Sequence, residues 1–422
     1  MSALLSDLLS VSADISADGE LSIAGCRVLD LAEEYGTPLF IYDEAHLRRR
    51  CREAVSAFGD GVAYATKAFL CTAMARLAHE EGMQLDVATG GELHVALHAG
   101  VPADRLVMHG NNKSELELRM ALESGVGRIV VDSFDELDRI ETLVGAGLPA
   151  PTVLIRVNPG VEAHTHEYLR TGAADSKFGF SLSDGMADAA IDRAAASSSV
   201  DLAGVHAHIG SQVFVVDSFS KAIAALAPLV RRVAAREFSI GGGLGVAYVE
   251  GESAPTIAEW AGSVKAACAE AGIESRILAE PGRSIVAQAA LTVYRVGTIK
   301  SIEGVRTYVS VDGGMSDNPR PVLYGSGYEA FLPRATHAKR DRLVRIVGKH
   351  CESGDVIVHE AMVPSDLAVG DILATPVTGA YGHTMGSNYN MVLRPPVVFA
   401  RDGLARLVVR RETFADLVDR DV

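Results

Sequence analysis

Residues 62–70 read VAYATKAFL, a short apolar run that a single lysine, Lys67, interrupts. The turn-forming residues 59–61 (GDG) precede it, and Cys71–Glu80 has the pattern of a helix. Lys67 therefore stands where a strand passes into a helix, and in parallel α/β proteins ligands collect at that edge because the strand C-termini converge there. An amine in apolar surroundings has a lowered pKa, which a lysine that bonds covalently to a carbonyl requires. The alternative interpretation is a lysine whose stem packs while its ammonium group reaches water.

Outward from Lys67, strand-like and helix-like runs alternate. The alternation is repeated eight times, which predicts a (β/α)₈ barrel over residues 37–288, of roughly the usual 250 residues. An open doubly wound sheet is the alternative. The eight strand-like runs are Val62–Thr66, Gln84–Ala88, Arg105–His109, Arg128–Val131, Thr152–Val157, Gly204–His208, Glu237–Ile240 and Arg276–Glu280. The helix-like runs are His46–Phe58, Cys71–Glu80, Glu92–Ala99, Glu115–Ser124, Phe134–Gly145, Gly185–Ala196, Phe219–Arg236 and Thr256–Ala271.

The rhythm changes after Arg283, where short β-like runs are separated by turns. Residues 1–36 hold too few apolar positions for a domain of their own. We therefore expect a β-rich domain made of residues 289–422 together with the N-terminal segment 1–36, which supplies one of its strands. The β-like runs are Tyr294–Ile299, Val305–Val311, Leu343–Val347, Asp355–Val358, Ile372–Thr375 and Val397–Ala400.

Composition and charge restrict the classes of partner. The chain has 422 residues and a formal net charge of −15, which argues against nucleic acid or an anionic membrane as a partner. No basic segment leads into an apolar run near the N-terminus, and no apolar stretch is long enough to cross a bilayer, so neither a secretory signal nor a membrane span is expected. The five cysteines are scattered and lack zinc-ligand spacing, which fits a reducing, cytoplasmic location.

Three groups of polar residues follow the last three strands of the predicted barrel. Strand six ends in HAHIGS (206–211), and only one of His206 and His208 is expected to face inward. Strand seven ends in three glycines, whose amides can close on an anion, and barrels often bind phosphate near strands seven and eight. Strand eight ends in EPGR (280–283), which joins a carboxylate to a guanidinium. Together with Lys67 they offer an amine, a flat ring, a phosphate site and an anionic partner, the four groups that pyridoxal phosphate (PLP) needs.

These motifs resemble those of the fold-type III PLP decarboxylases, which pair an alanine-racemase-like barrel with a β domain. Within that group the chain resembles the diaminopimelate decarboxylases, and the likeness extends from about Pro38 to Pro396. Decarboxylation of meso-2,6-diaminopimelate to L-lysine and CO₂ is the activity that the resemblance implies. The motifs are YATKA (64–68), VNPG (157–160), HTHEY (164–168), SKFG (176–179), HIGSQ (208–212), DGGMSDNPR (312–320), CESGD (351–355) and GAY (379–381).

The resemblance also implies roles for individual residues, in a homodimer whose sites are shared between subunits. Lys67 would bond to the cofactor, His208 would stack on its ring with His206 as the outward neighbour, and Glu280 would pair with the ring nitrogen. Cys351 would return a proton to the substrate, because a thiol beside a carboxylate keeps its proton at neutral pH. The residues implied at the cofactor are Lys67, His208, Ser211, Gly241, Gly242, Gly243, Glu280, Pro281, Gly282, Arg283 and Tyr381. The residues implied at the substrate are Arg283, Arg320, Tyr324, Glu352 and Tyr381.

Three alternatives compete with this hypothesis. A metal-dependent hydrolase could use His164, His166, His206 and His208 as ligands, but Lys67 would then be unexplained, and we expect no metal. A silent regulator with the same fold would be expected to lose the lysine or the acid. A decarboxylase of another basic amino acid, such as ornithine, arginine or lysine, is the third; arginines suit carboxylates, so the arginines of the site favour a substrate with a second carboxyl group.

Overall fold

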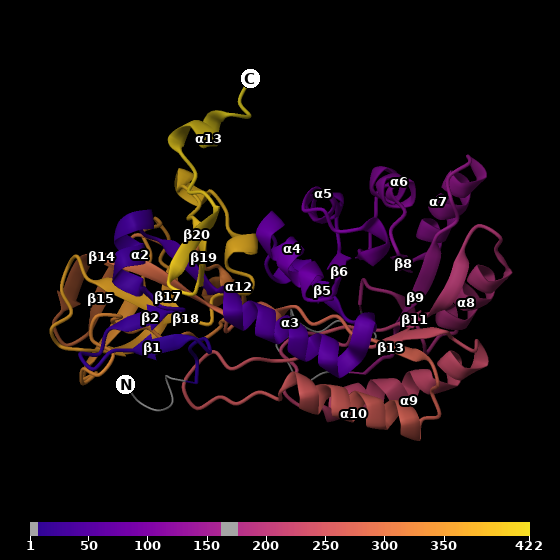
Figure 1. Ribbon diagram of the computed structural model, residues 1–422, viewed down its shortest axis with the longest axis horizontal. Coiled ribbons are helices and arrows are strands. Elements are labelled where there is room, and N and C mark those ends of the chain that lie inside the picture. Colours follow the sequence, from indigo (N-terminus) through magenta and orange to yellow (C-terminus); the bar gives the residue numbers. More distant parts are fainter. Residues whose placement is uncertain (1–6, 162–175) are drawn as a thin grey trace. The chain divides into compact units, whose positions relative to one another are not determined.

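The computed structural model describes residues 7–161 and 176–422, and their contacts divide the chain into two compact units (Figure 1). The first, which we call the barrel unit, consists of Arg50–Gly245 and Ala254–Ser284. The other, which we call the β unit, consists of Met1–Arg49, Val246–Ser253 and Ile285–Val422. The HTHEY motif with His164 and His166 lies outside the described residues.

Eight parallel strands form the barrel unit, and each pairs with the next along the chain. A parallel bridge between Val62 and Ala279 brings the first strand beside the last and closes the circle. The predicted (β/α)₈ barrel is thus confirmed, and the open sheet is excluded. The strands are β5 (Ala63–Ala65), β6 (Gln84–Val87), β7 (Leu106–Met108), β8 (Arg128–Val131), β9 (Thr152–Asn158), β11 (Asp201–His206), β12 (Glu237–Ser239) and β13 (Arg276–Leu278), and the short β10 (Phe180–Ser181) pairs with β9.

Helices alternate with these strands and form the outside of the barrel unit, where Figure 1 shows α9 and α10 side by side. Four of them begin at a Ser or Thr whose side-chain oxygen accepts the amide hydrogen three residues on, which satisfies a free N–H of the first turn. Inside, the strands meet in a buried apolar cluster of Val107, Val130, Leu154, Ala203 and Leu278. The helices are α4 (Thr72–Glu80), α5 (Gly90–His98), α6 (Glu115–Ser124), α7 (Phe134–Gly145), α8 (Met186–Ala196), α9 (Asp217–Arg232) and α10 (Ile257–Glu270).

A buried ion pair ties the β7–α6 connection to α7. The side chain of Lys113 is fully buried, and its Nζ lies 2.6 Å from Oε1 of Glu136. The same ammonium donates to the carbonyl oxygens of Gly110 and Val130 at 2.8 and 2.6 Å. The other carboxylate oxygen of Glu136 accepts the amide of Asp132. A buried charge that keeps its partner and its hydrogen bonds is tolerated, whereas a single charge left behind is costly.

We therefore expect Lys113→Met to lower the free energy of unfolding by about 3–5 kcal/mol, because the carboxylate of Glu136 would remain buried without a cation. Urea unfolding followed by circular dichroism measures the change. The double variant Lys113→Met/Glu136→Gln is the matched control, since it removes both charges and keeps an acceptor for the Asp132 amide. If the double variant were as unstable as the single one, the uncompensated charge would not be the cause.

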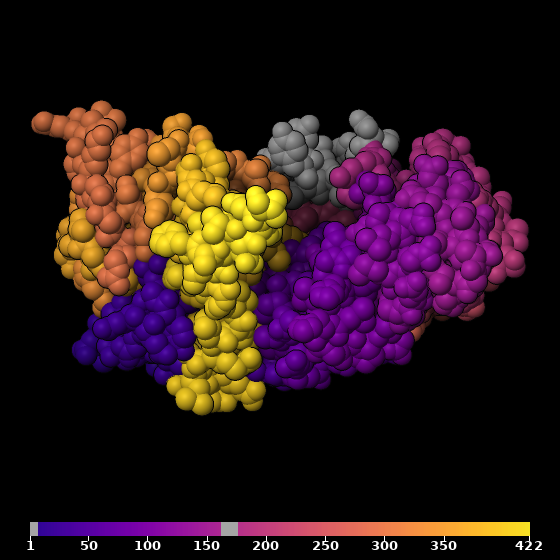
Figure 2. Space-filling view, turned by 90° about the horizontal axis from the view of Figure 1, so that it is seen from above, coloured from indigo at the N-terminus to yellow at the C-terminus, as the bar shows by residue number. Residues whose placement is uncertain are grey.

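The β unit is built on a mixed sheet of eight strands, in the order β17-β16-β15-β14-β4-β19-β20 with β18 against β14. The six β-like runs predicted from the sequence are all strands of this sheet. Figure 2 shows the end of the chain, in yellow, on the surface of this unit. The strands are β4 (Leu39–Asp43), β14 (Ala290–Ile302), β15 (Arg306–Val311), β16 (Arg342–Val347), β17 (Val356–Val363), β18 (Ile372–Pro376), β19 (Val397–Arg401) and β20 (Leu404–Val409).

The N-terminal boundary at residue 37 was wrong in detail. The strand that follows it, β4, pairs with β14 and β19 and so belongs to the β unit rather than to the barrel. The next helix, α3 (Glu44–Phe58), contains the division between Arg49 and Arg50. Within residues 7–36, the described part of the segment before residue 37, no strand joins the large sheet; β1 (Ala13–Ile15), β2 (Leu21–Ile23) and β3 (Cys26–Arg27) form a small sheet of their own, followed by α2 (Val28–Tyr35).

Among the described residues, no helix combines the length and the apolar character that crossing a lipid bilayer would require.

Candidate active site

Lys67 lies in a single 3₁₀ turn, Thr66–Ala68, between β5 and α4. The position at the carboxyl end of the first barrel strand is the one that the sequence predicted. Thr66 fixes this turn, because its hydroxyl donates to the carbonyl oxygen of Asp86 at 2.8 Å. The prediction of apolar surroundings was wrong. The side chain of Lys67 is exposed to an open pocket with charged walls, because neighbouring strand ends bring carboxylates, histidines and an arginine to it.

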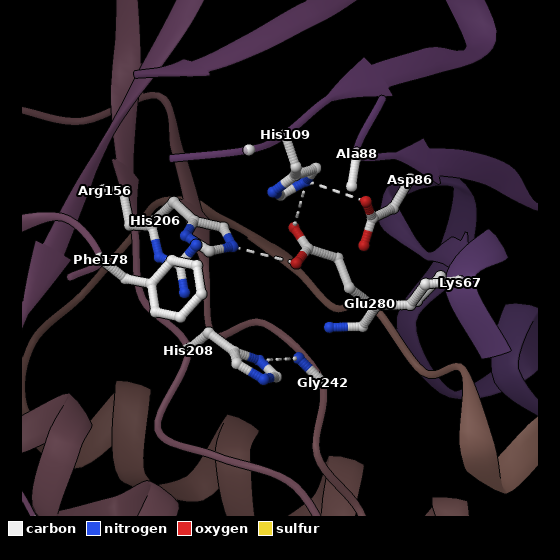
Figure 3. Close-up of a pocket in the computed structure, with 12 residues that line it drawn as sticks. Lys67, Asp86, Ala88, His109, Arg156, Phe178, His206, His208, Gly242 and Glu280 are labelled. Atoms are coloured by element: carbon white, nitrogen blue, oxygen red, sulfur yellow. Dashed lines mark hydrogen bonds and ion pairs between the residues drawn. The ribbon is translucent and has the colours of Figure 1, made fainter. Parts of the chain in front are cut away.

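A pocket with an empty volume of about 580 Å³ opens at this end of the barrel. In Figure 3 the amine of Lys67 points into the space bounded by Glu280, His208 and Gly242. Lys67 and Glu280 are more than two hundred positions apart in the sequence, and closure of the parallel barrel brings them to one place. The full lining is Ala65, Lys67, Asp86, Ala88, His109, Gly110, Arg156, Phe178, His206, His208, Gly242 and Glu280.

Glu280 is a buried carboxylate at the centre of a hydrogen-bond network. Its Oε2 lies 2.9 Å from Nε2 of His206, and its Oε1 accepts the hydroxyl of Ser239 at 2.9 Å and lies 3.5 Å from Nε2 of His109. Burial favours the neutral acid, but the two histidines and the hydroxyl outweigh it and hold the pKa of Glu280 below its usual value. Each ionised oxygen can accept more than one hydrogen bond, so the carboxylate retains capacity for a cationic ligand.

The expectation for His206 was wrong. It was taken as the outward neighbour of His208, yet both side chains line the pocket (Figure 3). The reason is that residues two apart along an extended chain point to the same side, so alternation does not separate position 208 from His206, the last residue of β11. His206 is 1% exposed and faces Glu280 directly, and its ring meets that of His109 edge to face at 5.1 Å.

His208 is fixed by the glycine run. The amide of Gly242 donates to its Nδ1 at 3.1 Å, so a neutral ring carries its proton on Nε2. Burial, reinforced by the charge of Lys67, holds the pKa of His208 well below its usual value, and the ring is neutral at pH 7. A neutral flat ring held at one edge is suited to stacking on an aromatic ligand.

The three glycines differ in what their amides do. Gly241 donates to Oγ of Ser239, and Gly242 donates to His208, so these two amides are engaged within the protein. Among the described residues the Gly243 amide has no partner, which leaves it available to an anion. No side chain fits here: a Cβ on Gly242 would lie 2.1 Å from the carbonyl oxygen of Glu280, and one on Gly243 2.1 Å from that of Gly210.

The remaining cofactor candidates of the barrel unit also lie near this end. Arg283 is buried and donates to Oγ of Ser211 at 2.9 Å, which joins the residues after strand eight to the HIGS segment. Pro281 accepts the amide of Ala65, and a Cβ on Gly282 would lie 3.0 Å from the carbonyl oxygen of Ala65. The strand-eight end is therefore packed against the chain that leads into Lys67.

The other candidates belong to the β unit. Arg320 is 2% exposed at the start of α12 (Arg320–Tyr324), where its guanidinium lies 3.9 Å from the ring centre of Tyr248 and donates to the hydroxyl of Tyr328 at 2.6 Å. Its Nε has no partner among the described residues, so a buried donor remains available. Tyr324 and Tyr381 are half-buried, and Cys351 and Glu352 are exposed on the turn before β17.

Besides His206, the sequence missed four lining residues with charged, imidazole or aromatic side chains: Asp86, His109, Arg156 and Phe178. Burial, and then the charge of Glu280, raises the pKa of Asp86 well above its usual value, whereas burial lowers that of His109. The carbon at the centre of the Arg156 guanidinium lies 4.4 Å from the ring centre of Phe178. The available signal was position: Asp86, His109 and Arg156 fall within or at the end of predicted strands, where alternation could have marked inward-facing polar residues.

The comparisons with known proteins agree with this architecture. Residues 44–287 match the family described as pyridoxal-dependent decarboxylase, pyridoxal binding domain, so the chain belongs to the pyridoxal-dependent decarboxylases. A Mycobacterium tuberculosis protein named diaminopimelate decarboxylase is 46% identical over 96% of this chain and 95% of its own. The Bacillus subtilis protein of that name is 44% identical, with coverage of 96% and 95%. A structure of diaminopimelate decarboxylase from M. jannaschii with L-lysine superposes with a TM-score of 0.91 at 32% identity, covering 98% of each chain.

Proposed function

We propose that this protein decarboxylates meso-2,6-diaminopimelate to L-lysine and CO₂ with pyridoxal phosphate as cofactor. The observation that carries the proposal is the agreement, over nearly the whole chain, with relatives of 44–46% identity that bear the name diaminopimelate decarboxylase. The barrel pocket supports it with the four kinds of group that the cofactor needs. The chemistry and the free cysteines also lead us to place the enzyme in the cytoplasm.

The residues of the pocket fit pyridoxal phosphate. An amine, a carboxylate held ionised and a neutral imidazole border one cavity, and an available amide lies in a glycine run that no larger residue could form. When bound, this cofactor supplies an aldehyde that bonds to amines and a ring that accepts the electrons of the bond broken as CO₂ leaves. Glu280 would hold a proton on the ring nitrogen, Lys67 would bond to the aldehyde, and His208 would cover one face of the ring.

The phosphate group would be held by the residues after strands six, seven and eight and by Tyr381. Gly243 supports this assignment through its available amide, and Ser211 through a hydroxyl beside Arg283. Gly241, Gly242, Pro281 and Gly282 would shape the same wall. Their tight contacts leave no room for a Cβ at the second glycine.

The end of the substrate that does not react carries a carboxylate and an ammonium group. We assign it to Arg283, Arg320, Tyr324, Glu352 and Tyr381. Arginines suit the carboxylate and Glu352 suits the ammonium group. The buried guanidinium of Arg320 supports the assignment, because two aromatic hydroxyl side chains hold it and its Nε is left without a protein partner among the described residues.

Competition between amino acids tests the proposed activity. Purified protein with pyridoxal phosphate is mixed with meso-diaminopimelate, ornithine, arginine and lysine, each labelled in the α-carboxyl group in turn, and released CO₂ is counted. We expect release from diaminopimelate alone. Release chiefly from ornithine, arginine or lysine would replace the proposal with the alternative decarboxylase, and no release from any of them would refute both.

We further propose a homodimer in which Cys351 of the partner subunit returns the proton to the carbon that loses CO₂. The exposure of this thiol supports the idea, because the other four cysteines are buried. Proton donation by a positioned side chain contributes about a hundredfold or more to a rate. Cys351→Ala is therefore expected to reduce kcat by about a hundredfold while the protein still binds its cofactor; full activity in this variant would assign the proton to another group.

Co-expression of Lys67→Ala and Cys351→Ala chains tests the sharing of sites. With shared sites, mixed dimers contain one intact site out of two, and mixed dimers are half of the total. About a quarter of the normal activity should therefore return. Activity no higher than that of the separate variants would place both residues in one chain's site.

A further inference from the structure

The turn that carries Cys351 and Glu352 is held from one side by a short segment, residues 388–391, far along the chain. The amide oxygen of Asn390 accepts the backbone N–H of Cys351 at 3.3 Å and lies 3.1 Å from Nδ1 of His350. The hydroxyl of Tyr389 donates to the carboxylate of Glu352, and this contact raises the pKa of Tyr389. The rings of His350 and Tyr389 are also in contact, with centres 5.4 Å apart and planes tilted by 31°.

The hydrogen bonds determine the orientation of each group. Because Cys351 offers only an N–H, the atom of Asn390 that meets it must be the oxygen, and His350 must then donate from Nδ1. In a neutral ring Nε2 is left as an acceptor, and Oγ of Ser316 lies 2.8 Å from it. His350 is 8% exposed, so this chain from Ser316 through His350 to Asn390 is anchored in the interior of the β unit.

The other end of the turn is fixed by Asp355. Its two oxygens accept the backbone amides of Met315 and His350 at 2.7 and 2.8 Å. A Cβ on Gly348 would lie 2.2 Å from a carboxylate oxygen of Asp355, so the backbone packs closely around it. Between these fixed ends, Cys351 and Glu352 are exposed and touch residues 388–391.

The backbone of residues 388–391 is strained where it contacts the turn that carries Cys351 and Glu352. Asn390 and Met391 both have positive φ, 51° and 54°. Asparagine tolerates this region, but a residue such as methionine loses about 1–2 kcal/mol in it. The side chain of Met391 is 59% exposed, so its own packing does not offset the strain. This backbone conformation is the one in which Tyr389 and Asn390 contact the turn. Backbone strain of this kind occurs preferentially at functional sites.

We propose that Asn390 and Tyr389 are positioning residues: Asn390 sets the place of the Cys351 thiol, and Tyr389 sets the place of the Glu352 carboxylate. The inference rests on the proposed function, in which Cys351 donates a proton and Glu352 binds the far end of the substrate. The two contacts therefore act on different kinetic constants. Loss of the Asn390–Cys351 contact lowers kcat, and loss of the Tyr389–Glu352 contact raises KM.

The reactivity of Cys351 tests the role of Asn390 without any substrate. Cys26, Cys51, Cys71 and Cys268 are buried, so alkylation of the holoenzyme by iodoacetamide, located by peptide mass, reports on Cys351. Asn390→Gly keeps the left-handed backbone and removes only the acceptor. We expect Cys351 in this variant to be alkylated at least about threefold faster, because the turn is released, and kcat to fall about tenfold at unchanged KM. Asn390→Asp, which keeps an acceptor oxygen, should restore an alkylation rate within about twofold of the unmodified protein.

Tyr389→Phe tests the second contact, since it removes one hydroxyl and keeps the ring beside His350. We expect KM for diaminopimelate to rise about tenfold with kcat within about twofold. An unchanged alkylation rate in Asn390→Gly, or an unchanged KM in Tyr389→Phe, would overturn the corresponding assignment. The alkylation result does not depend on which amino acid is decarboxylated, so failure of the proposed function would be seen separately, in the competition between substrates.

Discussion

Protein purified with its cofactor should show an absorption band near the edge of the visible range, which arises from the cofactor bonded to an amine. Lys67→Ala is expected to remove this band and to reduce the rate of decarboxylation by at least about a thousandfold. The reason is that the amine of Lys67 points into the barrel pocket between Glu280, His208 and Gly242. Without this amine, the pocket loses the group that would bond covalently to the cofactor. Absorption spectra and initial rates of CO₂ release measure the two effects.

Lys265→Ala is the matched control, because Lys265 is an exposed lysine on α10 in the same unit. It should keep the band and the rate. A band that persists in Lys67→Ala would mean that another amine bonds to the cofactor, and the assignment of Lys67 would fail.

Glu280→Gln is expected to lower kcat by about a hundred- to a thousandfold while the absorption band remains, shifted in wavelength. The structure gives the reason: burial, opposed by His206, His109 and Ser239, leaves a carboxylate that is ionised at the pH of the assay. Glutamine has almost the same size but no charge, so it fills the space without holding a proton on the ring nitrogen of a bound cofactor. The absorption band reports whether the cofactor is bound, and kcat reports the rate, so the two measurements distinguish loss of cofactor from loss of catalysis.

Glu280→Asp provides the comparison, since it keeps the charge and shortens the side chain. We expect it to lose less activity than Glu280→Gln. If the glutamine variant were as active as the unmodified protein, or if the aspartate variant were the weaker of the two, the charge of Glu280 would not be what the reaction uses.

Periodicity was enough to predict the barrel from the sequence. Eight β-like runs with helices between them can close only in a few ways, and the observed strands fall within a few residues of the predicted ones. The N-terminal boundary could not be found in the same way. The apolar run of β4 looks like any strand of a barrel, and only its pairing with β14 and β19, hundreds of residues further on, assigns it to the other sheet.

The site was predictable where motifs end strands and not where it depends on neighbours across the barrel. Lys67, His208, Gly242 and Glu280 follow strand ends and line one pocket. His206 was misplaced because positions 206 and 208 were assigned to opposite faces, whereas residues two apart in a strand share a face. The network of Asp86, His109 and Arg156 depends on which inward-facing residues of different strands approach one another. Closure of the barrel determines which of these side chains come close together, and the spacing of residues along one strand does not reveal it.

Borohydride reduction of the purified holoenzyme tests the central claim most directly. Reduction makes the bond between an amine and the cofactor permanent, and mass spectrometry of the digested protein then locates the added mass. The structure predicts one adduct with the mass of reduced pyridoxal phosphate, on the peptide that contains Lys67. An adduct on a peptide with Lys113, Lys177 or any other lysine, or no adduct in protein that is active, would contradict the account.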